Sequence, residues 1–229
     1  MKNIYLLLSL LFVAHGHSQD ELNTQTLVQS SNQLYTFDRS DKSIQGTPYM
    51  DKVFEPARVS SEITKIFYVR YNLVNDEMEV KNENEEVHAI NKSILNITVT
   101  FLKNNKTYQV FNYLEEDDSS SNGYFILLSN INAKSKLLLK ESKVFKEGQA
   151  AKSGYEQAVR PSFKKAKDKY FIKVGDDYAM ELPKNKKDVA KLFPKFESQI
   201  LSFIKKNKIK TSSKEDLLEL TEFIDYLVI

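Results

Sequence analysis

The chain has 229 residues, of which 41% are hydrophobic and 28% are charged, with six Gly and five Pro. This is the composition of an ordinary globular protein, which excludes wholesale disorder and fibrous repeats and allows a substantial buried core. The 33 basic and 31 acidic residues nearly cancel to a net charge of +2, so no global field indicates nucleic acid as a partner.

The near neutrality hides a contrast between the two halves of the chain. Residues 19–130 carry 10 basic and 17 acidic side chains, whereas residues 131–229 carry 22 basic and 14 acidic ones. The basic part either faces an anionic surface such as lipid, glycan or nucleic acid, or it carries solvated lysines on helices and sheet edges. The second interpretation is favoured, because nearly all of these residues are Lys and anion recognition favours Arg.

The N-terminus has the pattern of a secretory signal peptide. Lys2 supplies a positive charge, residues 4–14 form an apolar run, and Gly16 and Ser18 supply the small residues of a cleavage site. The run is shorter than the ~20 residues that span a bilayer, which disfavours an uncleaved membrane helix. We therefore expect export to the periplasm, the cell envelope or the medium after removal of residues 1–18. No Cys follows the run, so a lipoprotein is not expected, and no later segment is apolar enough to cross a membrane as a helix.

A polar linker is expected over residues 19–32, ahead of a β-rich domain over residues 33–183. Residues 33–37 are a short strand candidate, followed by a loop. Pro48 and Pro56 then indicate extended, edge-like segments and not interior strands, because Pro cannot donate a hydrogen bond to a neighbouring strand.

Alternating apolar and polar residues over 63–81 predict a β-hairpin. A two-residue turn at 75–76 places Tyr71 opposite Val80. A slip of one residue would bring the apolar row opposite carboxylates, so the pattern itself selects the register. The polar face sets Arg70 diagonal to Glu79, where the two charges can pair.

The segments GTPYMDKVFEPARV and YVRYNLVNDEMEVK together resemble a group of uncharacterised exported proteins from Bacteroidota, which show G-[ST]-P-Y, F-x-P-G and RYN…DEME segments. The match covers about 35 residues, and the middle segment departs from the pattern because Ala57 stands where the group has Gly. The resemblance implies export and lineage but no activity. The matching residues of unknown role are Gly46, Pro48, Tyr49, Arg70, Tyr71, Asn72, Asp76, Glu77 and Glu79, with Thr47 and Met78 beside them.

The next elements are also expected to be strands. Residues 87–90 form a short strand after an acidic turn, and residues 93–114 form a second hairpin. A two-residue loop at 104–105 sets Phe101 opposite Tyr108, which again gives one apolar face.

Residues 115–123 are polar and acidic and are interpreted as a solvated loop. Two more strands are expected at 124–128 and 136–145. Residues 146–166 contain two Gly and one Pro and are interpreted as a long irregular connection.

A third hairpin is expected over residues 170–182. A three-residue loop at 175–177 aligns Ile172 with Met180, whereas a two-residue loop would oppose Ile172 with a carboxylate. The three-residue loop is therefore preferred.

After residue 183 the hydrophobic period changes from 2 to 3.6, which indicates helices over residues 184–229. A short helix is expected at 186–193, a second from Pro194 to about residue 206, and a third capped by Ser212 or Ser213. The predicted fold class is α+β: about eight mostly antiparallel strands built of hairpins, with two to three C-terminal helices of the same domain packed against them.

Few catalytic chemistries remain open to this sequence. The chain has no Cys, which excludes thiolate catalysis and sulfur-ligated metals, and His88 is the only His beyond the signal segment. Alternation places His88 on the same strand face as Glu86, where a simple pairing explains it. The acidic loops at 117–118 and 176–177 lack the spacing of an EF-hand, so no catalytic, cofactor or metal residue is assigned.

The leading hypothesis is an exported, non-enzymatic binding or structural protein of the bacterial periplasm or cell envelope, acting on an unknown envelope component or protein and not on nucleic acid. The alternative is a carboxylate-dependent hydrolase of envelope or extracellular glycans, which requires two acids facing a cleft. A third hypothesis, a partner-binding module that uses the basic C-terminal helices, requires lysines clustered on one face.

Overall fold

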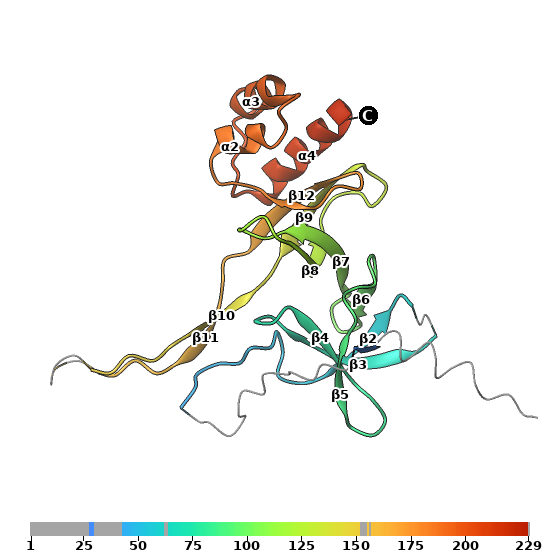
Figure 1. The fold of residues 1–229 in the computed structure, drawn as a ribbon, viewed down its shortest axis with the longest axis vertical. Helices are drawn as coiled ribbons and strands as arrows, with labels where there is room; N and C mark the ends of the chain where they lie inside the picture. Colours follow the sequence, from blue (N-terminus) through green and yellow to red (C-terminus); the bar gives the residue numbers. More distant parts are fainter. Residues whose placement is uncertain (1–27, 30–42, 62–63, 152–154, 156, 229) are drawn as a thin grey trace, which may run out of the picture.

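The computed structural model describes residues 28–29, 43–61, 64–151, 155 and 157–228. The chain is α+β, as predicted, and most of it forms one antiparallel sheet with the strand order β1-β5-β4-β3-β2-β6-β7-β8-β9-β12-β13 (Figure 1). A separate two-stranded sheet pairs β10 with β11. The strands are β1 Val28–Gln29, β2 Glu55–Val59, β3 Ile66–Asn72, β4 Glu77–Lys81, β5 Val87–Ile90, β6 Thr98–Phe101, β7 Lys106–Leu114, β8 Ser120–Leu127, β9 Ser135–Lys140, β10 Lys143–Lys146, β11 Ser162–Lys165, β12 Lys169–Val174 and β13 Met180–Glu181.

The first two hairpins form where predicted, but in a register shifted by two residues. Tyr71 lies opposite Met78 and not Val80, and Phe101 lies opposite Lys106 and not Tyr108. Both loops have four residues, and their last residues, Asp76 and Asn105, have φ of 54° and 55°. Because a shift of two preserves which face each side chain takes, the predicted apolar faces remain correct.

The third hairpin has the predicted register. Ile172 pairs with Met180, and the backbone N–H of Leu182 donates to the Tyr170 carbonyl at 2.8 Å. Gly175 opens the three-residue loop with a φ of +53°, a conformation that Gly adopts at little cost.

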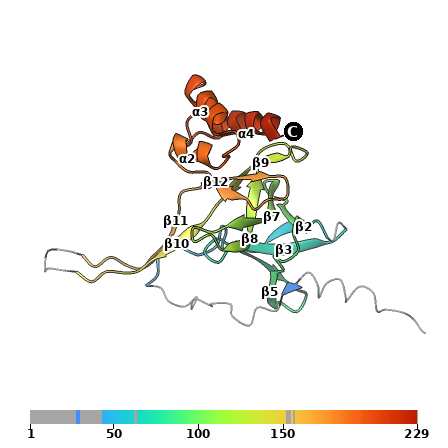
Figure 2. The ribbon, with the colours of Figure 1, turned by 45° about the horizontal axis from the view of Figure 1, so that its top comes forward.

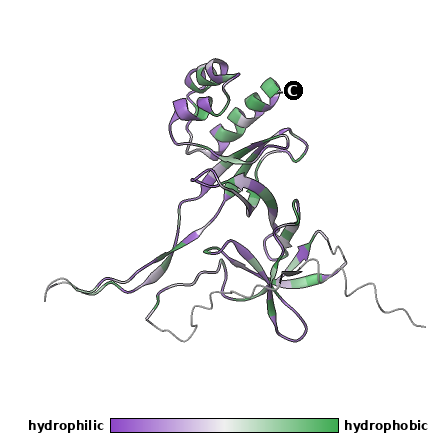
Figure 3. Ribbon diagram, viewed as in Figure 1, coloured by the Kyte–Doolittle hydropathy of each residue, from purple (hydrophilic) through white to green (hydrophobic). Residues whose placement is uncertain are grey.

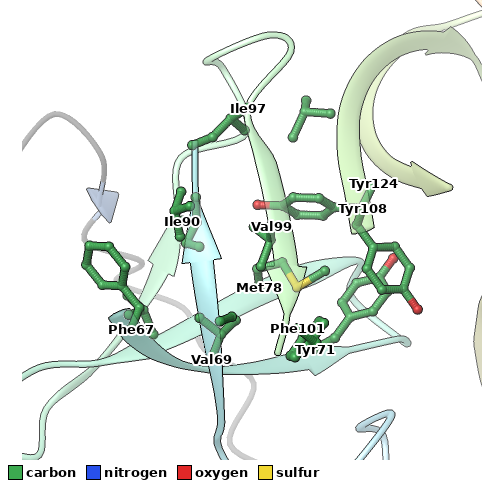
Figure 4. Close-up of a cluster of buried hydrophobic side chains, with 14 of the residues drawn as sticks. Phe67, Val69, Tyr71, Met78, Ile90, Ile97, Val99, Phe101, Tyr108 and Tyr124 are labelled. Carbon is green, nitrogen blue, oxygen red and sulfur yellow. The ribbon is translucent and has the colours of Figure 1, made fainter. Parts of the chain in front are cut away.

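The first core fills the concave side of β2–β8. Tyr71 packs edge-on against Tyr108 and Tyr124, with ring centroids 4.9 and 5.8 Å apart. Figure 4 shows these rings beside the side chains of Met78 and Val99. Edge-to-face pairs of this kind add to the free energy gained by burying the rings.

Several sequence predictions about strands were wrong. Pro56 does not mark an edge, since β2 lies between β3 and β6 in the sheet. A proline is tolerated at this position because the pairing of β2 with β6 ends there. The Pro56 carbonyl still accepts a hydrogen bond of 3.0 Å from the Leu102 backbone N–H. Val28–Gln29, expected in a linker, pairs with β5.

The region from 115 to 166 also differs from the prediction. Residues 120–123, expected in a loop, begin β8, and the predicted strand 136–145 is divided between β9 and β10. Residues 146–166, expected as an irregular connection, contain β11. This strand pairs with β10 to form a two-stranded ribbon (Figure 1). The structure therefore has more strands than the eight expected, while the predicted strand at 33–37 lies outside the described residues.

Three helices follow the sheet, at α2 Lys186–Lys191, α3 Glu197–Lys206 and α4 Lys214–Val228. The Ser213 hydroxyl accepts a bond of 3.2 Å from the Asp216 backbone N–H, so Ser213 is the predicted cap of α4. No helix among the described residues is long and apolar enough to cross a membrane.

The helices cover the β9–β12 end of the sheet (Figure 2). Their apolar faces, which Figure 3 colours green, bury Ile200 and Ile224 in one cluster with Leu137 of β9 and Ile172 of β12. Each fully buried side chain of this size contributes about 1.5–3 kcal/mol to the burial free energy. The helical segment is thus attached to the sheet by a continuous core.

Candidate functional site

The residues that match the exported-protein group are brought together in the fold. The segment around Pro48 runs beside the end of β3, where Leu73 N donates to the Pro48 carbonyl at 2.9 Å and Met50 N to the Tyr71 carbonyl at 2.8 Å. Tyr49 forms an isolated antiparallel bridge with Asn72. The two segments therefore pack side by side, although eight residues separate them in the sequence.

Arg70 and Glu79 form a buried ion pair on the face of the sheet opposite the first core. Their side chains are 4% and 2% exposed, and the Arg70 Nε donates to a Glu79 carboxylate oxygen at 3.1 Å. The guanidinium lies over the rings of Tyr49 and Phe54, at 3.6 and 4.4 Å from their centroids. The predicted pairing is confirmed, with the two residues directly opposite and not diagonal.

The turn after β3 is shaped by Asn72 and ends at Asp76. The Asn72 side-chain oxygen accepts bonds from the backbone N–H groups of Val74 and Asn75 at 3.1 and 3.2 Å. Gly46 has a φ of +84° and approaches β11 so closely that an added Cβ would lie 2.8 Å from the Phe163 carbonyl oxygen. These group-matching residues thus fix backbone geometry.

Asp76 is the centre of a polar cluster that joins the β3–β4 turn to β8 and β9. Its carboxylate accepts bonds from the Tyr71 hydroxyl at 2.6 Å, the Lys140 ammonium at 2.7 Å and the Tyr124 backbone N–H at 3.3 Å. Burial, together with the Asp76 charge, raises the pKa of Tyr71 well above its ordinary value. Tyr71 therefore stays protonated and acts as a donor to Asp76.

The remaining matching residue, Glu77, is half-buried next to Asp76. Burial raises its pKa, and the nearby Lys92 ammonium offsets part of that shift. Glu77 does not line the pocket beside Lys140 and Lys169.

Gly123 of β8 makes the contact between Asp76 and Lys140 possible. A Cβ at this position would lie 2.5 Å from the Lys140 Nζ and 2.7 Å from an Asp76 carboxylate oxygen. The absent side chain leaves the space in which the two charges meet. Lys140 also lies over the rings of Tyr113 and Phe125, at 4.7 and 4.6 Å from their centroids.

Lys140 leads from this cluster into an open pocket of about 470 Å³. The pocket lies between the β7–β8 turn and the strands β9, β12 and β13. Aromatic side chains contribute to its wall and charged side chains surround them. The lining residues are Tyr113, Leu114, Glu115, Glu116, Asp117, Ser119, Lys140, Ser142, Lys169, Phe171 and Glu181.

The charged groups of the pocket are held by one another. The Lys169 ammonium donates to Glu116 at 2.7 Å and to Glu181 at 2.8 Å, which raises the pKa of Lys169. The same bond lowers the pKa of Glu116, and bonds from Ser119 lower that of Asp117. These carboxylates are therefore ionised at neutral pH.

The pocket carries more negative than positive charge, because four carboxylates face two ammonium groups and Lys140 is already paired with Asp76. This suits the binding of a cation beside an aromatic wall. It does not suit proton donation by Glu116 or Asp117, since a catalytic general acid needs a raised pKa.

Sequence reasoning missed this pocket. Residues 115–119 were interpreted as part of a solvated loop. The side chains that form the pocket with them belong to β9, β12 and β13, which are distant in sequence. His88 is placed as predicted, with its Nε2 3.7 Å from a Glu86 carboxylate oxygen. Among the described residues no group of three or more His, Asp or Glu side chains is placed to hold a metal ion.

Comparison with known proteins gives no relative. No family model matches the chain, and no curated protein or solved structure matches it either. The site is therefore interpreted from its own geometry.

Proposed function

We propose that the chain is an exported, non-enzymatic binding protein of the bacterial periplasm or cell envelope and that the pocket beside Lys140 and Lys169 holds its ligand. The signal-like pattern of residues 1–18 supports export. The observation that carries the binding role is the open pocket of about 470 Å³ with aromatic residues in its wall and a carboxylate-rich rim. A volume of this size accommodates a small molecule or a few side chains of a peptide.

The chemistry of the wall selects a ligand that joins a positive charge to an apolar part. Glu115, Glu116 and Asp117 lie on the β7–β8 turn, and the rings of Tyr113 and Phe171 lie beside them. A primary amine or a basic peptide segment places its cation on the rim and its carbon chain on the rings. An anionic ligand would meet net repulsion at the same rim.

The test is native mass spectrometry of the chain from Gln19, which retains every described residue, after incubation with envelope extract. We expect a reproducible adduct that is lost in Glu116→Lys. Glu116 is 85% exposed in its side chain, so this change reverses a rim charge with little effect on stability.

The matched control is Glu83→Lys, which reverses an exposed charge on the turn between β4 and β5. It should keep the adduct. An adduct that survives Glu116→Lys unchanged would place the ligand elsewhere. A clean unliganded mass in the wild type would contradict the binding role and favour a structural one.

A further inference from the structure

The ribbon of β10 and β11 projects away from the rest of the molecule in both views (Figures 1 and 2). Its strands pair Lys143 with Lys165 through to Lys146 with Ser162. The same register continues to Gln149 and Val159, which exchange two backbone hydrogen bonds of 2.8 Å. The ribbon is therefore an extended arm of regular geometry.

Isolated two-stranded hairpins are marginally stable in water, so the base of the arm needs support. Gln45 supplies it, because its N–H donates to the Pro161 carbonyl and its carbonyl accepts from Phe163 N, both at 2.9 Å. Further out, Gly148 allows the two strands to lie close together at Pro161, since an added Cβ on Gly148 would lie 2.9 Å from the Pro161 Cδ. The arm is thus held at a defined position.

One face of the arm carries unpaired cations. Side chains alternate between faces along each strand, so the register places Lys164, Lys146 and Arg160 on the same face, on three successive rungs. All three are exposed, and their side chains form no hydrogen bond or ion pair with the described part of the chain. Glu147 lies on the opposite face. The other members of the cationic face are Val144, Gly148, Ala150, Ala158 and Ser162.

We propose that this cationic face docks onto an anionic lipid surface, independently of the ligand pocket. Rungs on one face are about 7 Å apart, so the three cations span about 14 Å in a row that a flat surface can meet at once. Val144 and Gly148 beside them are exposed and are apolar or small, whereas Ser162 is buried next to Gln45. The strands β10 and β11 place no aromatic side chain on this face on which a nucleic-acid base could stack.

The expected strength follows from the number of cations. Each basic residue near an anionic membrane increases the affinity about fivefold, so the row of three increases it about a hundredfold. Binding should weaken strongly as salt is added, because screening acts on exposed charges.

The test is flotation of the chain from Gln19 with vesicles of phosphatidylcholine, with or without phosphatidylglycerol. We expect binding to the vesicles that contain phosphatidylglycerol and little binding to pure phosphatidylcholine. The variant Lys146→Gln/Arg160→Gln/Lys164→Gln should lose about a hundredfold in affinity. Its circular dichroism and thermal unfolding should match the wild type, since all three side chains are exposed.

The matched control is Lys186→Gln/Lys195→Gln/Lys206→Gln, which removes the same charge from exposed positions on the helical segment. It should bind like the wild type. Equal losses in both variants would reduce the effect to net charge and overturn the proposal. The proposal would also be overturned if the three cations of the ribbon supported binding to a soluble polyanion, or self-association, while the protein did not bind vesicles.

Discussion

Replacing Glu79 by Leu would leave the Arg70 guanidinium buried without its counter-charge. The two side chains are 4% and 2% exposed, and breaking such a buried pair costs about 3–5 kcal/mol of unfolding free energy. The rings of Tyr49 and Phe54, at 3.6 and 4.4 Å, still attract the cation by about 0.5–2 kcal/mol. We therefore expect Glu79→Leu to lose about 3 kcal/mol.

Arg70→Met should cost a similar amount, because it leaves the Glu79 carboxylate buried and unpaired. The double variant Arg70→Met/Glu79→Leu removes both charges and replaces them with apolar side chains of comparable size. Such replacements are often neutral or stabilising, so the double variant should lie within about 2 kcal/mol of the wild type. The two single losses should therefore be strongly non-additive.

The assay is urea unfolding at neutral pH, followed by circular dichroism, for the wild type and the three variants. Glu85→Gln is the control, since Glu85 is 76% exposed in its ion pair with Lys81 and the pair should contribute less than about 1 kcal/mol. If the losses at Arg70 and Glu79 add, the pair is not coupled and the reasoning from its burial is refuted.

Two further predictions concern the polar clusters. Gly123→Ala places a Cβ 2.5 Å from the Lys140 Nζ and should lower the unfolding free energy by about 1–3 kcal/mol, measured by thermal melting; an unchanged melting temperature would mean that Lys140 is free to move. Burial alone would raise the pKa of Glu141, but hydrogen bonds from Lys106 and Tyr108 outweigh it and lower the pKa. The folded protein therefore gains stability from ionised Glu141 above the unfolded pKa of about 4.3 and loses it as the pH falls through the lower folded pKa. In urea unfolding, Glu141→Gln should cost about 1–3 kcal/mol at pH 7 and progressively less below about pH 4, and a pH-independent difference would contradict this assignment.

The alternation of apolar residues predicted which side chains are buried but not how the hairpins close. A two-residue loop and a four-residue loop give registers that differ by two, and both place Tyr71 and Phe101 toward the core. In the four-residue loops Asp76 and Asn105 have positive φ. Asn and Asp tolerate this conformation in either kind of turn, so their presence does not distinguish the two loop lengths. Binary patterning therefore predicts the faces and leaves the register open.

The features that sequence reasoning missed depend on contacts between distant segments. The Arg70–Glu79 pair could be predicted from the hairpin, but its burial depends on Tyr49 and Phe54, which another segment lays over it. The β10–β11 arm has no apolar alternation, because Ser162 and Phe163 are the buried residues of its two strands and they are adjacent in sequence. The helices were predicted well, since a one-sided apolar face is a local signal.

The buried clusters explain what Asp76, Tyr71 and Asn72 contribute to the fold. Asp76 holds the Lys140 ammonium at 2.7 Å from one side, while Lys140 lines the pocket on the other. Tyr71 donates to the same carboxylate, and Asn72 shapes the turn that presents it. None of the three residues lines the pocket, yet together they set the position of a side chain that does. Their role is therefore positioning.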